Sequence, residues 1–151
     1  MITIADILRP EHVLLDLNPA ENKDAVWDVA MLLKTDDRVQ NWSRFYESLK
    51  TTSIEAGPGV EICIPHARTK SVGSMVMSAG RVSGGASPAG LAQKIRYIFV
   101  IGIPVAFASD YLRIIGSVAR MFKSQDTEGI LREVRSPEQF VAILNGKEMQ
   151  L

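Results

Sequence analysis

Two histidines and one cysteine are the side chains of this sequence best suited to nucleophilic or acid–base chemistry. His66 ends an apolar stretch, directly after Pro65, and Arg68 follows two residues later. A proline removes one backbone donor and restricts the preceding residue to an extended conformation, so a strand is expected to end here. Ligands and reactive side chains gather at strand ends in α/β domains, and an arginine fork suits an anion such as phosphate. We therefore predict that residues 64–68 form the functional centre and that His66 is its reactive residue.

Two observations weigh against reading chemistry into every histidine. One histidine and one arginine form a weak motif, and spacing alone slightly favours a structural role for His66. The other histidine, His12, follows Arg9-Pro10-Glu11 and is expected in a loop that leads into a strand. Because nothing nearby in the sequence could orient its ring, we interpret His12 as a solvated loop histidine.

Other chemistries lack the residues that they need. Zinc requires three or four ligands, and two histidines with one cysteine give no recognisable spacing. Cys63 alternates with His66 along the strand, so a Cys–His nucleophile pair is conceivable, but an apolar run favours a core cysteine. The turn at residues 57–59 is followed by neither a P-loop lysine nor a dinucleotide fingerprint. Ser-His-Asp catalysis has no nucleophile elbow from which to start.

The composition describes an ordinary globular protein. The chain has 151 residues, 46% of them apolar, with 17 basic and 17 acidic side chains. Neutral charge gives no electrostatic footprint for nucleic acid. No signal peptide is evident and no apolar run approaches the ~20 residues that span a bilayer, so we expect a cytoplasmic protein without membrane insertion. One domain over residues 1–151 is expected.

Hydrophobic periodicity and turn signals predict alternating helices and strands, which indicates a layered α/β domain. The stretch 96–103 is apolar on both faces, as in a central strand covered by helices on both sides. Asn18, Ser109 and Ser136 are expected to begin helices, and Gly146 to end the last one. In the helix after residue 109, the apolar stripe is predicted to be Leu112, Ile115, Ala119 and Phe122. Helices are predicted at 4–8, from 18, at 41–50, from 109, at 127–134 and from 137, and strands at 13–17, 60–64, 75–82 and 96–103.

Residues 56–69, Ala-Gly-Pro-Gly-Val-Glu-Ile-Cys-Ile-Pro-His-Ala-Arg-Thr, carry a family resemblance. They resemble the signature of enzyme IIA domains of the fructose/mannitol type, phosphocarriers of the bacterial phosphotransferase system that include the nitrogen-regulatory IIA proteins. The usual pattern, Ser-Thr-Gly-Ile-Gly-Asn-Gly-Val-Ala-Ile-Pro-His-Ala-Arg, aligns without a gap from Glu55. The resemblance covers nearly the whole chain, although only the central motif is specific. It implies a three-layer α/β sandwich with a mixed central sheet flanked by helices on both faces.

The resemblance also implies a function. The histidine of Pro-His-Ala-Arg, here His66, accepts a phosphoryl group from phosphohistidine on the carrier HPr or its nitrogen-branch equivalent. It then passes the group to a IIB domain. A neutral imidazole nitrogen is a competent nucleophile, and electrostatic stabilisation of the phosphoryl oxygens does most of the catalytic work. The resemblance implies that no metal or other cofactor is needed, and that the only modified group is a transient phosphohistidine.

Three positions depart from the family pattern. The family's second histidine, which assists transfer, corresponds to Tyr111, a phenol that is uncharged at neutral pH. An arginine before the Gly-rich turn corresponds to Lys50, which keeps the charge but loses the bidentate fork. A glycine corresponds to Glu61, whose carboxylate would repel phosphate if it pointed towards His66.

Two hypotheses follow from these residues. In the first, the protein is a phosphocarrier in which Arg68, Lys50, Tyr111 and the backbone amides near Ser109 hold the phosphoryl oxygens around His66. In the second, the protein keeps the fold as a regulatory binding module that no longer transfers phosphate. Tyr111 equally fits an amphipathic helix residue that packs its ring.

Overall fold

The computed structural model describes residues 2–17, 24–57, 60–82, 95–123 and 126–150, and the statements below concern these residues. In chain order the elements are α1 (Ile4–Ile7), β1 (Leu8–Leu17), α2 (Ala25–Met31), α3 (Trp42–Glu47), β2 (Lys50–Gly57), β3 (Val60–Arg68), β4 (Val76–Val82), β5 (Ile95–Ile103), α4 (Ala108–Lys123), α5 (Thr127–Glu133) and α6 (Pro137–Met149).

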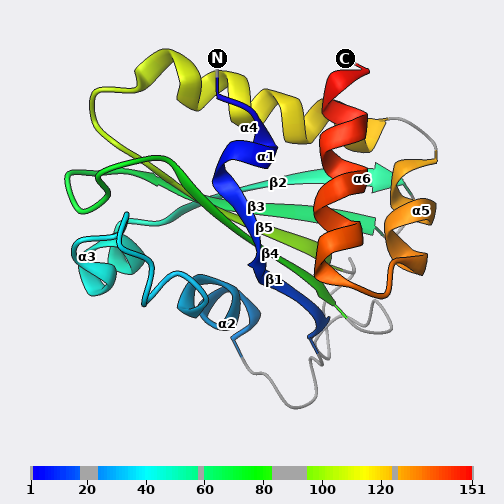
Figure 1. Cartoon of the computed structure of the whole chain (residues 1–151), viewed down its shortest axis with the longest axis horizontal. Coiled ribbons are helices and arrows are strands. Elements are labelled where there is room, and N and C mark those ends of the chain that lie inside the picture. The colour runs from blue at the N-terminus through cyan, green and yellow to red at the C-terminus, as the bar shows by residue number, and fades with distance from the viewer. Residues whose placement is uncertain (1, 18–23, 58–59, 83–94, 124–125, 151) are drawn as a thin grey trace.

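The five strands form one mixed sheet in the order β1-β4-β5-β3-β2. The pairs β1–β4 and β3–β5 are parallel, whereas β4–β5 and β2–β3 are antiparallel. The carboxyl ends of β3 and β5 therefore lie at one edge of the sheet, where β4 and β2 begin. The start of α4 follows the end of β5 and lies at the same edge (Figure 1).

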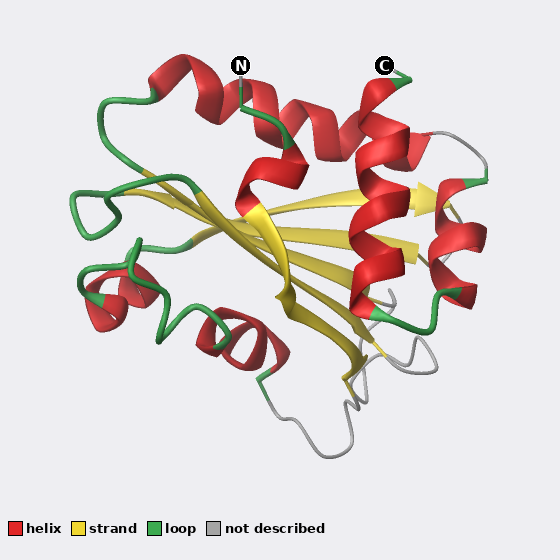
Figure 2. Cartoon of the chain, in the orientation of Figure 1, coloured by secondary structure: helices red, strands yellow, loops and turns green. Residues whose placement is uncertain are grey.

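Helices cover both faces of this sheet, with α1, α4, α5 and α6 on one side and α2 and α3 on the other (Figures 1 and 2). Alternate residues of β5 explain the arrangement. Tyr97, Phe99 and Ile101 pack into the core beneath α4 and α6, whereas Ile98 and Val100 pack into the core beneath α2. Because side chains alternate along a strand, a strand that is apolar throughout needs a cover on both faces. The predicted three-layer sandwich is confirmed.

Local signals placed several elements correctly. The Ser136 side chain accepts a hydrogen bond from the backbone amide of Gln139 at 3.2 Å and caps α6 as predicted. Phe45 is buried on the inner face of α3, and Asn41 caps that helix. The predicted strands at 75–82 and 96–103 correspond to β4 and β5.

Other boundaries differ from the prediction. The helix predicted at 41–50 ends at Glu47, and Lys50 begins a strand, β2, that the pattern does not reveal. Gly146 does not end the last helix, which continues to Met149. A glycine inside a helix costs only about 1 kcal/mol relative to alanine, so its presence alone does not stop the helix. Ser109 lies inside α4 rather than before it. The predicted start at Asn18 and the loop at 84–88 lie outside the described residues.

The buried stripe of α4 is also rotated relative to the prediction. Leu112 is 69% exposed, and Ile115 and Ala119 are only partly buried. Of the predicted stripe only Phe122 is buried. The sequence offers two overlapping apolar stripes, and contact with the sheet selects between them. The buried apolar residues of α4 are Ile114, Val118, Met121 and Phe122.

The described helices include none that is both long and apolar enough to cross a lipid bilayer.

Gly80 in β4 marks a close approach between the sheet and α2. A Cβ atom there would lie 2.5 Å from Cγ2 of Val29 and 2.6 Å from Cδ1 of Leu17. We predict that Gly80→Ala lowers the free energy of unfolding by about 1–3 kcal/mol, because overpacking forces neighbouring side chains out of their rotamers. Urea titration followed by circular dichroism measures the change.

Gly129 in α5 provides the matched control, because a Cβ atom there would meet nothing within 4 Å. Gly129→Ala should leave stability unchanged or raise it by about 0.5–1 kcal/mol, as alanine favours a helix over glycine. A Gly80→Ala protein that unfolds at the wild-type urea concentration would contradict the close packing.

Candidate functional site

His66 lies in β3, two residues before its end, and its side chain is on the face covered by α4. Ile62 and Ile64, which share its alternation, pack into the core beneath α4 and α6. Nδ1 of His66 lies 2.9 Å from the backbone oxygen of Ile64. A carbonyl oxygen can only accept, so this hydrogen bond requires the proton on Nδ1. In the neutral ring Nε2 then carries a lone pair.

Two basic residues share this face of the sheet. Lys50 on β2 is the Cα partner of His66, and directly opposed residues of an antiparallel pair project to the same side. Arg68 lies two residues beyond His66 on β3 and is exposed at the carboxyl edge. Among the described residues neither side chain has an acidic partner within salt-bridge distance. Both cations are therefore available to an anion brought to His66.

Tyr111 reaches the same place from the first turn of α4. Its ring centroid lies 5.4 Å from that of His66, with the two planes inclined by 54°. The ring is half-buried and packs against the core beneath α4. Its backbone N–H donates to the carbonyl of Phe107 at 3.1 Å, so the helix is already wound at this residue. His66 beneath it is only 8% exposed.

The structure thus brings together the four residues that the sequence singled out, His66, Lys50, Arg68 and Tyr111. It also separates two others from them. Cys63 packs into the core beneath α2 and α3, on the opposite face of the sheet from His66. The idea of a Cys–His pair is therefore wrong.

Burial, followed by the nearby charge of Glu61, raises the pKa of the Cys63 thiol to about 11. A cysteine with this pKa carries almost no thiolate at neutral pH and is a poor nucleophile. The effect of Glu61 on Cys63 agrees with the strand alternation, which directs both side chains to the face away from His66. Glu61 and His66 are five residues apart along β3, about 16 Å. The Glu61 carboxylate is therefore too far away to repel an anion at His66.

The sequence suggested that His12 is a solvated loop histidine, and this prediction is wrong. It lies within β1, is 6% exposed, and its Nε2 is 3.6 Å from a carboxylate oxygen of Asp36. Asp36 also binds Arg38 through contacts of 2.7 and 2.9 Å, and Arg9 approaches at 3.4 Å. Hydrogen bonds from Arg38 hold the pKa of the Asp36 carboxyl well below its usual range. The sequence missed this cluster because Asp36, which lies beside the ring, is distant along the chain.

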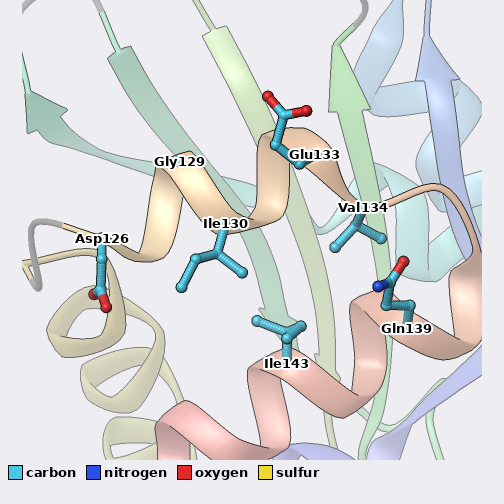
Figure 3. A pocket seen from close by; sticks show the side chains of 7 residues that line it. All are labelled: Asp126, Gly129, Ile130, Glu133, Val134, Gln139 and Ile143. Carbon is cyan, nitrogen blue, oxygen red and sulfur yellow. The ribbon is translucent and has the colours of Figure 1, made fainter.

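A metal site is not evident in the described part of the chain, which holds no group of three or more His, Cys, Asp and Glu side chains suited to an ion. A surface hollow of about 540 Å³ lies between α5 and α6 (Figure 3), and His66 is not among the residues that line it. Its walls offer no histidine, cysteine or basic side chain. The lining residues are Asp126, Gly129, Ile130, Glu133, Val134, Gln139 and Ile143.

The mixed sheet with its two helical layers is the fold of phosphotransferase-system IIA proteins. The chain is similar to the nitrogen regulatory protein IIA-Ntr from Neisseria meningitidis, with a TM-score of 0.68 and 23% identity, over 93% of this chain and 98% of that one. It is also similar to the mannitol-specific cryptic phosphotransferase enzyme IIA CmtB from Escherichia coli, with a TM-score of 0.65 and 16% identity, over 96% of this chain and 99% of that one. No curated protein is a recognisable relative by sequence.

A family model, described as phosphoenolpyruvate-dependent sugar phosphotransferase system, EIIA 2, matches residues 6–147. The chain therefore belongs to this family, as the Pro-His-Ala-Arg segment predicted.

The buried His12 makes the stability of the protein depend on pH. Desolvation lowers the pKa of His12 from its ordinary value of 6.5, despite the opposing charge of Asp36. Below pH 6.5 the unfolded chain therefore binds a proton that the folded protein resists, so stability falls as the pH falls. We predict that the urea midpoint drops between pH 7.5 and about pH 5.

The control is His12→Gln, which cannot titrate. Its overall stability differs from wild type, but its urea midpoint should change less over the same pH range. Equal slopes for the two proteins would show that His12 does not titrate differently on folding.

Proposed function

We propose that this protein is a phosphocarrier that accepts a phosphoryl group on Nε2 of His66. The observation that supports the proposal most is the hydrogen bond from Nδ1 to the Ile64 carbonyl. It orients the ring and leaves Nε2 as the nucleophilic nitrogen. Family membership supplies the reaction class.

In the transfer, the lone pair of Nε2 forms a bond to phosphorus while the N–P bond of the donor phosphohistidine breaks. The phosphoryl group passes from the donor histidine to His66, and this transfer needs no oxidant or metal. Lys50 and Arg68 neutralise charge on the phosphoryl oxygens, and the first free amides of α4, around Ser109, donate to them. The Tyr111 hydroxyl supplies a further donor once its ring has moved.

The donor is an HPr-type phosphocarrier, and the acceptor is either a IIB domain or a regulatory target. One similar structure is a nitrogen regulatory protein and the other a mannitol-specific enzyme, so both branches remain open for this chain. Encounter with such carriers takes place in the cytoplasm. The reaction requires no cofactor beyond the transient phosphohistidine.

A second candidate is a regulatory binding module of the same fold without transfer. Two observations favour it: Tyr111 stands where a second histidine would carry charge, and His66 is only 8% exposed. Such a module would bind a partner protein with the same affinity whether or not residue 66 is histidine.

Phosphorylation distinguishes the two functions. We predict that incubation with phosphoenolpyruvate, enzyme I and HPr, or their nitrogen-branch counterparts, adds one acid-labile phosphoryl group, detected by intact mass. His66→Ala should abolish the addition. The buried His12 does not contribute a nucleophile, so His12→Gln should retain it and controls for nonspecific loss of histidine.

Arg68→Ala should slow phosphorylation about tenfold or more, because a hydrogen bond to a charged group contributes ~1.5 kcal/mol or more. Arg68→Lys should recover part of the rate by restoring the charge without the fork. A wild-type protein that gains no phosphate from either set of donors would eliminate the phosphocarrier and leave the binding module.

A further inference from the structure

We propose that Tyr111 is a specificity-determining residue that shields His66 from small phosphodonors and yields only when a protein carrier docks. The inference rests on the proposed phosphocarrier function, since it concerns which phosphodonors can reach Nε2 of His66. Its geometric basis is the position of the Tyr111 ring, 5.4 Å from the His66 ring.

Phosphoryl transfer requires more access to Nε2 than the His66 ring offers in the free protein. The reacting atoms must come within about 3–3.5 Å along the line of the breaking bond. His66, however, is only 8% exposed, with Lys50 and Ile101 as its neighbours in the sheet and Tyr111 on the α4 side. The sheet backbone cannot move aside without breaking its ladders. The Tyr111 ring, by contrast, belongs to a side chain that can rotate aside.

The Tyr111 side chain is held by fewer interactions than the other two tyrosine side chains. The hydroxyl of Tyr46 donates to Asp24 at 3.0 Å and that of Tyr97 to the Glu128 carbonyl at 3.2 Å. The Tyr111 hydroxyl has no such partner among the described residues, and packing alone retains the ring. Rotation about its side-chain bonds therefore breaks no hydrogen bond to the described protein.

Exposed apolar side chains near Tyr111 explain why a protein donor could displace the ring when a small phosphodonor could not. Leu112, the next residue of α4, is 69% exposed, and Val105, in the turn before the helix, is 42% exposed. A carrier that brings phosphohistidine to Nε2 must press on this turn and gains contacts there that offset the displacement of the ring. A small phosphodonor has no such contacts and depends on spontaneous opening.

Reaction with diethyl pyrocarbonate tests the shield without any phosphotransferase component. The lone pair of an accessible imidazole nitrogen forms a bond to a carbonyl carbon of the reagent, and ethyl carbonate leaves. Peptide mass spectrometry resolves the reaction of His66 from that of His12. A shield that opens for roughly 10% of the time or less predicts that Tyr111→Ala accelerates reaction at His66 about tenfold or more.

Three controls make the result specific. Tyr111→Phe keeps the ring, so His66 should react at a rate close to that of wild type. Leu112→Ala removes a neighbouring exposed side chain and should also leave the rate unchanged. The buried His12 should remain slow in every variant; if it becomes reactive in Tyr111→Ala, the fold has loosened and Tyr111→Leu, which keeps apolar volume, takes its place.

Equal rates at His66 in wild type and in a folded ring-deletion variant would overturn the proposal, as would a Tyr111→Phe protein as reactive as Tyr111→Ala. Because the reagent needs no enzyme I or carrier, this result is independent of the phosphorylation assay. Failure of the shield and failure of the phosphocarrier function are thereby distinguishable.

Discussion

The hydrogen bond between Nδ1 of His66 and the carbonyl of Ile64 connects the fold to its chemistry. Donor and acceptor belong to the same strand, two residues apart, with Pro65 between them. This geometry depends on an extended backbone held from both sides, and β3 is paired with β2 and β5. Helical layers on both faces keep the strand dry and rigid. The orientation of the His66 ring therefore depends on a strand that is paired along both sides.

Pro65 itself is an exception to a local rule. Proline removes a ladder donor and is uncommon within a strand that has neighbours on both sides. Such violations are expected at functional positions, where local preference yields to the requirements of a site. The exception falls directly before the histidine.

Strand alternation then divides the chemistry between the two faces of β3. His66 shares its face with Lys50 and Arg68, whereas Cys63 and Glu61 belong to the other. Because side chains alternate between the two faces of a strand, the Cys63 thiol and the Glu61 carboxylate both lie on the face away from His66. The remaining site is a single histidine with two cations and a covering phenol.

The sequence could single out this candidate site because its signals are local. A proline, a histidine and an arginine stand within four residues at the end of an apolar strand, and the central motif to which they belong resembles the signature of one family. The sequence did not predict properties that depend on contacts between distant segments. Asp36 reaches β1 only in the folded protein, so the buried position of His12 could not be read from its neighbours along the chain.

The same reasoning explains the other differences. Lys50 belongs to a strand because β3 pairs with it, although its own neighbours favour a helix. Leu112 is exposed because contact with the sheet selects the stripe through Ile114 and Val118. Propensity describes what a segment can form, and tertiary packing decides which alternative is realised.

The most direct test of this account is the tautomer of His66, measured by long-range ¹H–¹⁵N correlation spectroscopy of the imidazole ring above neutral pH. The Ile64 hydrogen bond predicts that Nδ1 carries the proton and that Nε2 shows the chemical shift of an unprotonated nitrogen. A spectrum in which Nε2 is protonated and Nδ1 is not would contradict the account, because the nitrogen that faces a donor would then have no lone pair to offer.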